Sequence, residues 1–385
     1  MSRPVGIALL GAGWMGDAHS SSYRRVPFHY PDCDGQARLV VVADEVADRA
    51  RRAAEVFGYE RWTTDWREAL AHPDVDAVSI TAPNFLHREM ALAAADAGKH
   101  LRAEKPLGRF PDETVEIAGA VERAAVRCIV GLNYRHAPAV QQAANLIAAG
   151  ALGEVNHFRM QMVASYAASP RGALSWRFLR ERAGLGILGD LGSHAFDLAQ
   201  MLLGPIARVC ATSAIVVPRR PLPVPGGTHF SVVDDGAELG DVENEDWVAA
   251  LIEFERGVRG TVELSRVMVG ADARYSFEVN GTEGSVAWNF ERMNELELLA
   301  TAASGDRGVA RILSGPDQPD FAAFQPGTGI PMGFEDLKVI EARLFLQSVA
   351  DGEQRAPGVR EIAAAARVLG AVDRSCRSGR WEDAV

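Results

Sequence analysis

Cysteine is scarce in this sequence, and none of its cysteines lies at a spacing typical of metal binding. Four occur among 385 residues, at positions 33, 128, 210 and 376, with no CxxC or cysteine–histidine pattern. This excludes a disulfide-stabilised secreted fold and a zinc module, and it predicts free thiols in a reducing compartment. We therefore expect a cytoplasmic protein without a metal site.

Long apolar runs and an excess of positive charge are also missing. No stretch approaches the ~20 apolar residues of a membrane-spanning helix, and the N-terminus has no signal-peptide cleavage pattern. The formal net charge is −11, whereas nucleic-acid binding requires a concentrated basic surface. We expect neither a membrane nor a nucleic acid as a partner, and a small molecule is the remaining class.

The chain is longer than the ~250–300 residues at which single hydrophobic cores stop growing, so two domains are expected. Strand-like and helix-like runs alternate over residues 1–132, which predicts a doubly wound Rossmann domain that binds a dinucleotide. Strand-like runs predominate over residues 133–385, which predicts an α+β domain with an open, mostly antiparallel sheet. The fold class is therefore α/β.

The predicted second sheet has one face that needs a cover. A second subunit would provide it, so we expect a homodimer or homotetramer through this sheet, in a domain that also binds the substrate. Residues 218–245 and 305–333 are rich in proline, glycine and aspartate and show little periodicity. They are expected to form long loops without regular elements.

A glycine-rich turn follows the first predicted strand at once. Val5–Leu10 is a continuous apolar run, typical of a strand buried on both faces, and Gly11, Gly13 and Gly16 then form GxGxxG. In this strand–turn–helix context Gly11 permits the tight turn, Gly13 lets the backbone approach a pyrophosphate, and Gly16 lets the helix pack closely. The helix N-terminus supplies N–H groups for the phosphates. The motif predicts a dinucleotide site.

The strand predicted over residues 39–43 is followed by Asp44. A carboxylate at this place accepts hydrogen bonds from the adenosine ribose and repels a 2′-phosphate, so NAD is expected in preference to NADP. Glu45 adds to the repulsion, whereas Arg49 and Arg52 are near enough in sequence to weaken it. The alternative is that Asp44 only caps the helix that follows.

Two further predicted strands, residues 77–81 and 100–103, lead into Ala82-Pro83-Asn84 and Glu104-Lys105-Pro106. Ligands of open α/β sheets bind at the carboxyl ends of the strands, so Lys105 is expected at the binding edge. The alternative is a surface lysine before a turn proline.

A helix is predicted over residues 185–203, where apolar residues recur at helical spacing up to Gly204. Asp190 and His194 are four residues apart and would project from one face of it. A carboxylate one turn from an imidazole orients the ring and raises its basicity, which suits a general base. Because isolated DxxxH pairs also arise from packing alone, the pair by itself leaves both interpretations open.

Together these motifs resemble those of the Gfo/Idh/MocA oxidoreductases, over nearly the whole chain. The segments that carry the resemblance are GAGWMG (11–16) with Asp44, APNFLH (82–87), AGKHLRAEKPLG (97–108), LNYRHAP (132–138), SWRF (175–178), GILGDLGSHAFDL (186–198), NGTEGSVAWNFER (280–292) and FEDLKVIEARLF (334–345). SWRF and the last two are most similar to the subgroup that includes levoglucosan dehydrogenase. The resemblance implies an NAD-dependent dehydrogenase that oxidises a secondary hydroxyl of a sugar, anhydrosugar or cyclitol.

The family's catalytic residues correspond to Lys105, Asp190 and His194. His194 is the better general base, because the unperturbed pKa of histidine, ~6.5, lies near the working pH. Lys105 is expected to orient the hydroxyl and to donate to the developing alkoxide, while Asp190 orients His194 or a neighbouring hydroxyl. Family members often have a cis bond at this proline, so a cis Lys105–Pro106 bond is expected.

The resemblance also implies the binding residues. The expected cofactor-binding residues are Gly11, Gly13, Trp14, Met15, Gly16, Asp44, Ala82, Asn84, His87, Glu104 and Lys105. Asn84 and His87 correspond to the family's cofactor-side loop, although a structural role explains them equally well. The expected substrate-binding residues are Tyr134, Arg135, Trp176 and Arg177, and Phe324 and Gln325 are candidates for closing over the substrate.

Two other functions are compatible with this fold. Some relatives hold the nicotinamide tightly and use it for transient oxidation, which results in glycoside cleavage or group transfer. A cofactor that survives dialysis, without net reduction of added NAD, would indicate this function. The other possibility is a non-catalytic regulator that senses the dinucleotide, and the complete set of Lys105, Asp190 and His194 argues against it.

Overall fold

The computed structural model describes residues 3–223, 231–233, 236–301 and 307–384. The chain forms two compact units, the first from residues 1–136 and 332–363 and the second from residues 137–331 and 364–385. The sequence analysis assigned everything after residue 132 to the second domain. Residues 332–363 belong instead to the first unit, because helix α11 (Phe334–Asp351) packs against helix α1 (Trp14–His29) of that unit.

The first unit contains a parallel sheet, as predicted. The strand order is β3-β2-β1-β4-β5-β6, and every neighbouring pair is parallel. The strands are β1 (Val5–Leu10), β2 (Ala37–Ala43), β3 (Arg61–Thr63), β4 (Ala77–Ile80), β5 (His100–Ala103) and β6 (Cys128–Val130). All residues of β1, β4 and β6 are buried, which explains their continuous apolar sequences.

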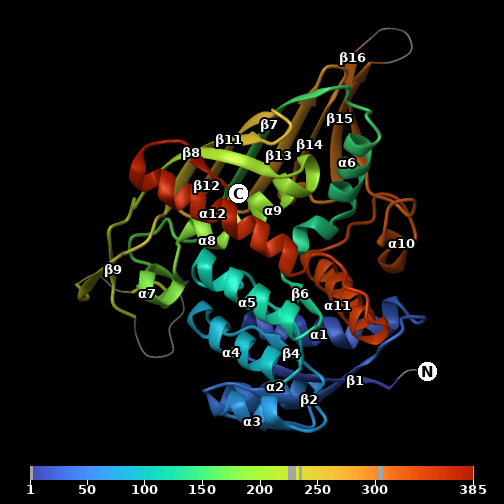
Figure 1. Cartoon of the computed structure of the whole chain (residues 1–385), viewed down its shortest axis with the longest axis vertical. Coiled ribbons are helices and arrows are strands. Elements are labelled where there is room, and N and C mark those ends of the chain that lie inside the picture. The colour runs from blue at the N-terminus through green and yellow to red at the C-terminus, as the bar shows by residue number, and fades with distance from the viewer. Residues whose placement is uncertain (1–2, 224–230, 234–235, 302–306, 385) are drawn as a thin grey trace. The chain divides into compact units, whose positions relative to one another are not determined.

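Helices cover this sheet in the doubly wound arrangement. The remaining helices of the unit are α2 (Ala47–Phe57), α3 (Trp66–Ala71), α4 (Asn84–Asp96), α5 (Pro111–Arg123) and the 3₁₀ helix η1 (Asn133–His136). Residues of α3, α4 and α5 share one hydrophobic cluster with the strands, and α4 and α5 lie side by side in Figure 1. The short elements β3 and α3 were missed by the sequence analysis, because each spans too few residues to show a period.

The second unit contains a nine-stranded mixed sheet of order β16-β15-β14-β13-β7-β12-β11-β8-β17. All neighbouring pairs are antiparallel except β7 with β12. The strands are β7 (Val155–Val163), β8 (Ile206–Ala214), β11 (Trp247–Phe254), β12 (Arg259–Ser265), β13 (Arg274–Gly281), β14 (Ser285–Asn289), β15 (Glu295–Thr301), β16 (Arg307–Leu313) and β17 (Glu382–Asp383). The mostly antiparallel sheet that was predicted is thus confirmed.

One face of this sheet is covered by helices, as the alternation of buried and more exposed residues in β11 and β13 requires. Helices α6 (Pro138–Ala148), α8 (Ile187–Asp190) and α9 (Gly192–Leu203) contact its strands. The other elements here are α7 (Arg180–Ala183), η2 (Trp176–Phe178), η3 (Phe290–Arg292), and α12 (Val359–Ser378), whose first residues belong to the first unit.

The stretches predicted as loops contain regular elements. Strands β9 (Arg219–Pro221) and β10 (Leu239–Asp241) pair within residues 218–245, and β16 and helix α10 (Phe321–Phe324) lie within 305–333. Strand β16 pairs with the preceding strand β15, and the many turn-forming residues of these stretches gave no periodic signal for the strands. Residues 224–230, 234–235 and 305–306 of these stretches lie outside the described part of the chain.

The predicted helix over residues 185–203 is divided into α8 and α9 by Leu191. Gly189 and Gly192 flank the break and lower the helical preference there. The hydroxyl of Ser193 donates to the carbonyl of Gly189 at 2.6 Å, a contact to the preceding turn that is known to bend helices. Asp190 therefore ends one helix, and His194 lies in the first turn of the next.

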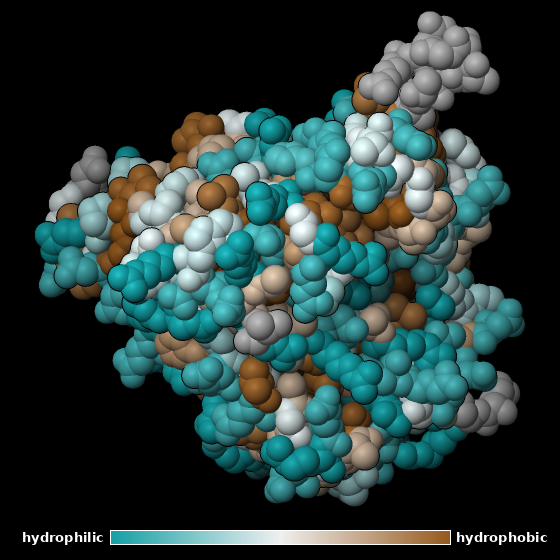
Figure 2. All heavy atoms as spheres, turned by 45° about the horizontal axis from the view of Figure 1, so that its top comes forward, coloured by the Kyte–Doolittle hydropathy of each residue, from teal (hydrophilic) through white to brown (hydrophobic). Residues whose placement is uncertain are grey.

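The surface agrees with the charge content of the sequence. Figure 2 shows a face on which hydrophilic side chains predominate, with hydrophobic residues in separate patches between them.

All four cysteines are free, as expected. Among the helices that the structure describes, none has the length and apolar character that crossing a membrane requires.

A buried ion pair anchors the core of the second unit. Arg266 donates to Asp246 Oδ1 at 2.7 Å, and both side chains are almost completely buried. Asp246 Oδ2 also accepts the backbone N–H groups of Val216 and Val217 at 2.9 Å each. The carboxylate thus connects strand β12 to the segment that follows β8.

We expect Asp246→Ala to lower the free energy of unfolding by about 3–5 kcal/mol, because it leaves the Arg266 guanidinium buried without its carboxylate. Glu278→Ala is the matched control, since its pair with Arg159 is solvent-exposed on both sides, and about 0–1 kcal/mol is expected there. Urea unfolding followed by circular dichroism measures both. Equal losses in the two variants would contradict the assignment of Asp246 as the anchor.

Candidate functional site

The glycine loop of the first unit has the geometry that the motif predicts. Gly11 has φ +103°, and a Cβ at this position would lie 2.7 Å from the backbone nitrogen of Ala82. A Cβ at Gly16 would lie 2.3 Å from the carbonyl oxygen of Gly11. At Gly13, by contrast, a Cβ would meet no atom within 4 Å. Two glycines are thus required by close packing, while the third leaves the backbone open to a ligand.

The Asp44 side chain binds the backbone of the glycine loop. Its Oδ2 accepts the backbone N–H of Ala12 at 2.8 Å, and its Oδ1 accepts that of Val46 at 2.9 Å. Asp44 therefore forms a turn just before α2 (Ala47–Phe57), whose N-cap is Val46 without a side-chain cap, so the helix cap considered as an alternative is not formed. Arg52, which was expected to soften the repulsion of a phosphate, forms an ion pair with Asp17 at 3.0 Å.

The segment after β4 is tied to the segment after β5 by His87. This buried ring lies with Nδ1 2.8 Å from the carbonyl oxygen of Pro106 and Nε2 2.7 Å from that of Ala82. Burial lowers the pKa of His87, while the two carbonyl oxygens act in the opposite direction. Both nitrogens face backbone, which favours the structural role of His87. Asn84 is the first residue of helix α4, three residues before His87.

Glu104 and Lys105 follow β5 and have different environments. Glu104 is buried, with Oε1 2.5 Å from Lys338 Nζ and 3.0 Å from His19 Nε2. This carboxylate is directed into the interior of the unit, and the expected part of Glu104 in cofactor binding stays a prediction. Lys105 is half-buried, and the Lys105–Pro106 bond is cis, as predicted.

Aromatic side chains surround the start of α1. Trp14, its first residue, is 70% exposed and stacks on Phe334 with a centroid distance of 5.9 Å. Phe334 in turn lies 6.3 Å from the ring of Tyr134. Tyr134 and Arg135 are buried in η1, directly after β6, and Met15 is half-buried in the first turn of α1. These rings line the approach to the glycine loop within the first unit.

In the second unit, Asp190 is fixed by a residue that the sequence analysis did not identify. The hydroxyl of Tyr166 donates to Asp190 Oδ2 at 2.8 Å. Burial raises the pKa of Tyr166 well above its usual range, and the Asp190 carboxylate raises it further. Tyr166 is thus a permanent donor to Asp190. His194, four residues on, is buried in the first turn of α9.

Helix α8 is held by Glu245, which the sequence analysis placed in a loop. Glu245 Oε1 accepts the backbone N–H of Leu188 at 3.0 Å, and the Glu245 carbonyl accepts that of Ile187 at 3.0 Å. A Cβ at Gly186 would lie 2.3 Å from the same carbonyl oxygen. Burial raises the pKa of Glu245. The close approach at Gly186 and the side-chain cap together position the turn that ends in Asp190.

Trp176 and Arg177 lie on η2 beside a fixed aromatic ring. The Arg177 guanidinium is 4.7 Å from the centroid of Trp176. The next residue, Phe178, is buried, with the guanidinium carbons of Arg220 and Arg266 at 4.2 and 4.6 Å from its centroid. This cation–π contact anchors η2.

Of the two residues expected to close over the substrate, Phe324 ends α10, and Gln325 donates to the carbonyl of Pro331 at 3.0 Å.

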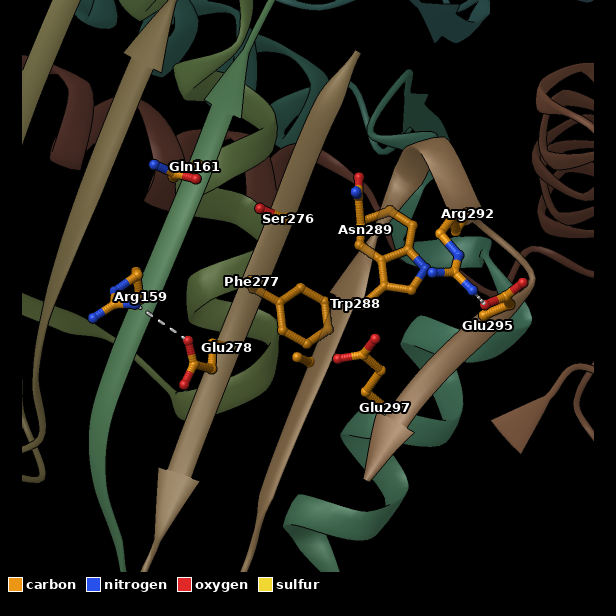
Figure 3. Close-up of a pocket in the computed structure, with 11 residues that line it drawn as sticks. Arg159, Gln161, Ser276, Phe277, Glu278, Trp288, Asn289, Arg292, Glu295 and Glu297 are labelled. Atoms are coloured by element: carbon orange, nitrogen blue, oxygen red, sulfur yellow. Dashed lines mark hydrogen bonds and ion pairs between the residues drawn. The ribbon is translucent and has the colours of Figure 1, made fainter. Parts of the chain in front are cut away.

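A hollow lies over strands β7, β13, β14 and β15 of the large sheet. Figure 3 shows Arg159 directed toward Glu278 and Arg292 toward Glu295, with Gln161 and Glu297 nearby. As far as the described residues go, its lining includes none of the predicted site residues. The hollow is therefore a feature of the sheet and separate from Asp190 and His194.

A dinucleotide fits the residues of the first unit. The position next to Gly13 is open, and the N-terminus of α1 directs free N–H groups toward it. Each oxygen of Asp44 accepts one backbone N–H in this structure. Since a carboxylate oxygen has two acceptor positions, both oxygens retain capacity for ribose hydroxyls.

Comparison with known proteins gives matches over both units. Residues 5–132 match the model of the oxidoreductase family with an NAD-binding Rossmann fold, and residues 140–287 match the GFO/IDH/MocA C-terminal domain. The levoglucosan dehydrogenase of Pseudarthrobacter phenanthrenivorans is 35% identical over 98% of both chains. The scyllo-inositol 2-dehydrogenase (NAD(+)) of Bacillus subtilis is 31% identical over 79% of both chains.

Solved structures agree with these matches. A levoglucosan dehydrogenase in complex with NADH and levoglucosan superposes with a TM-score of 0.93 at 34% identity, covering 99% of this chain and 100% of that one. An oxidoreductase domain protein from Kribbella flavida gives 0.92 at 34% identity, with complete coverage of both. With its glycine loop and the predicted fold present, this chain belongs to the GFO/IDH/MocA family of NAD-binding oxidoreductases.

Proposed function

We propose that this protein is an NAD-dependent dehydrogenase that oxidises a secondary hydroxyl of a sugar, anhydrosugar or cyclitol. The observation that carries the proposal is the fixation of Asp190 by Tyr166 at the turn that leads to His194. A buried histidine four residues after an anchored carboxylate is consistent with a general base and the group that orients it. The names of the relatives, which act on levoglucosan and scyllo-inositol, support the substrate class.

The proposed reaction divides the work among three side chains. His194 accepts the hydroxyl proton of the substrate, and Asp190 holds the imidazole and stabilises the charge that it gains. Lys105 donates a hydrogen bond to the same oxygen and stabilises the developing alkoxide. When bound, NAD⁺ supplies the hydride acceptor. The carbon loses a hydride as the oxygen loses a proton, and the hydroxyl becomes a ketone.

The remaining predicted residues have supporting roles in this proposal. Trp176 offers an apolar ring face and Arg177 a set of donors, which suits a neutral polyol with hydroxyls on its edges. Tyr134 and Arg135 border the nicotinamide side from η1.

We also propose that the outer face of the large sheet joins copies of the chain into a homodimer or homotetramer. Sedimentation equilibrium of the intact protein distinguishes these two states from a monomer.

We expect His194→Ala and Lys105→Met each to lower kcat by ~10²–10⁴-fold, because each removes proton-transfer or alkoxide stabilisation in the transition state. Affinity for NADH, measured by its fluorescence on titration, should change little in His194→Ala, since the imidazole acts on the substrate hydroxyl. His157→Ala is the control, because this histidine is exposed on β7. Turnover of the wild-type level in His194→Ala, on a substrate found by screening sugars and cyclitols, would refute the assignment.

Tyr166→Phe and Asp190→Asn should displace the pH profile of oxidation in opposite directions. Oxidation requires a neutral His194, so the rate rises with pH as the imidazolium loses its proton. Removing the Tyr166 hydroxyl leaves the Asp190 charge unshared, which favours the imidazolium and moves the rising limb to higher pH. Asp190→Asn removes the charge and moves the limb to lower pH. The measurement is kcat/KM from pH 5 to 10, and displacement of both limbs in one direction would contradict the mechanism.

NAD should be preferred over NADP by about 100-fold or more in kcat/KM, a difference of about 2.7 kcal/mol, because Asp44 and Glu45 repel a 2′-phosphate. Asp44→Ala should weaken NADH binding and reduce the preference, since it removes both the ribose acceptor and the contact to Ala12. Asp48→Ala, whose carboxylate is exposed in the first turn of α2, is the control. An unchanged preference in Asp44→Ala would exclude Asp44 as the ribose contact.

A further inference from the structure

A cluster of five ionisable side chains is buried in the interior of the first unit. His19 comes from α1, Arg102 and Glu104 come from β5 and the residue after it, and Lys338 and Glu341 come from α11. None of the five is more than 9% exposed at its side chain. The cluster therefore connects a C-terminal helix to the segment that precedes Lys105.

The contacts form a continuous chain of charge-assisted hydrogen bonds. Lys338 Nζ lies 2.5 Å from Glu104 Oε1 and 3.4 Å from Glu341 Oε2. Arg102 Nε donates to Glu341 Oε1 at 2.9 Å, and Arg102 Nη2 donates to the carbonyl of Lys338 at 3.0 Å. His19 Nε2 lies 3.0 Å from Glu104 Oε1. Each carboxylate thus has a cationic partner within hydrogen-bonding distance.

The charges in this cluster balance. Burial, together with the nearby Arg102, lowers the pKa of His19 to about 3, so the ring is neutral. Burial raises the pKa of Glu104, but the Lys338 ammonium and the hydrogen bond from His19 lower it more and hold it well below its usual range. Two cations and two carboxylates therefore neutralise each other. Removing one of them leaves an unpaired charge in a buried site, which is strongly unfavourable.

The same residues resemble a metal site in composition. His19, Glu104 and Glu341 offer ligand atoms that lie within 4.8 Å of one another. The Lys338 ammonium, however, lies between the two carboxylates and occupies the position that a cation would take. The cluster is therefore an internal ion-pair network.

Lysine is rare in this chain, which makes its presence at 338 informative. Only three of the 40 lysine and arginine residues are lysines, namely Lys99, Lys105 and Lys338. Lysine carries a compact charge with three donors, whereas arginine has a planar fork that needs more room. One lysine is the proposed catalytic residue, and another binds the carboxylate next to it.

Glu104 is fixed on several sides at the point where the chain turns toward Lys105. Its backbone N–H donates to the carbonyl of Ile80 at 2.9 Å. Its carboxylate lies against the backbone after β6, since a Cβ at Gly131 would be 2.7 Å from Glu104 Oε1. The residue before Lys105 therefore has little freedom while the Lys338 contact is intact.

We propose that Lys338 is a positioning residue, which, by holding the Glu104 carboxylate, fixes the backbone from which Lys105 projects. The inference rests on the proposed function, because it takes Lys105 as the group that contacts the substrate hydroxyl. Helix α11 thereby acts on the reaction without contacting the substrate.

The scarcity of lysine permits a direct test without substrate. Reductive methylation with ¹³C-formaldehyde labels lysine amines, and the Lys105 signal is identified by its loss in Lys105→Arg. We expect Lys338→Met to change the chemical shift and titration of the Lys105 signal. Lys99→Met is the matched control, since Lys99 donates to the carbonyl of Val75 at the far end of the strand, and it should leave the signal unchanged.

Steady-state kinetics of the single and double variants distinguish a positioning role of Lys338 from a role in neutralising the Glu104 charge. Lys338→Met should lower kcat by about 10- to 100-fold with KM changed less than about threefold, as expected when a reacting group is misplaced. It should also add an ionisation to the pH profile, because the Glu104 carboxyl loses its partner. The groups that still face Glu104 are His19, His87, Arg102 and Glu341. Glu104→Gln/Lys338→Met removes both charges and should abolish the added ionisation, while kcat stays at least about tenfold low.

The Lys105 signal and kcat of the double variant decide whether Lys338 has a positioning role. If the double variant has the wild-type Lys105 signal and kcat, the pair only neutralises charge and the positioning role is overturned. The double variant also serves if Lys338→Met does not fold, because it contains no unpaired buried charge. Wild-type turnover in Lys105→Met would instead refute the proposed function, and the Lys105 signal would still show whether Lys338 positions that side chain.

Discussion

The pairing of Glu104 with Lys338 joins positions 234 residues apart, and the first unit depends on it. A buried carboxylate requires a partner, and what β5 and α1 contribute to the buried cluster is Arg102, which binds Glu341, and a neutral His19. The partner comes from α11, late in the chain. This requirement explains in physical terms why residues 332–363 complete the dinucleotide-binding unit, although they follow the whole second sheet.

The features that the sequence predicted well are those with local causes. The glycine loop follows from the backbone geometry of Gly11 and Gly16, and both act on atoms that a strand–turn–helix brings together. Asp44 follows from its place after β2. Strand β1 spans the apolar run Val5–Leu10 residue for residue. Each of these signals is contained within a short window of sequence.

The features that were missed depend on distant partners. Tyr166 lies 24 residues from Asp190, and Glu245 lies 57 residues from the N–H group that it caps. No spacing rule connects such pairs, since they meet only once the large sheet has formed. The Lys338 contact was missed for the same reason, because a motif match does not show the partner of a side chain. The division between α8 and α9 has a local cause instead, in Gly189, Gly192 and Ser193, but a match to the helical period does not show where a helix bends. The catalytic assignment of Lys105, Asp190 and His194 therefore remains a proposal.

Both units use buried charge to hold the segments on which function is proposed to depend. In the first unit the ion-pair network fixes the residue before Lys105, and in the second Arg266 with Asp246 fixes Phe178 next to Trp176 and Arg177. Buried ion pairs contribute little to stability compared with apolar residues of the same shape, because desolvation offsets their attraction. Their directional contacts instead limit the positions that a side chain and its backbone can take. A fold that needed stability alone would be served as well by leucine and methionine at these places, so what the charges add is the fixed position of the segments that they join.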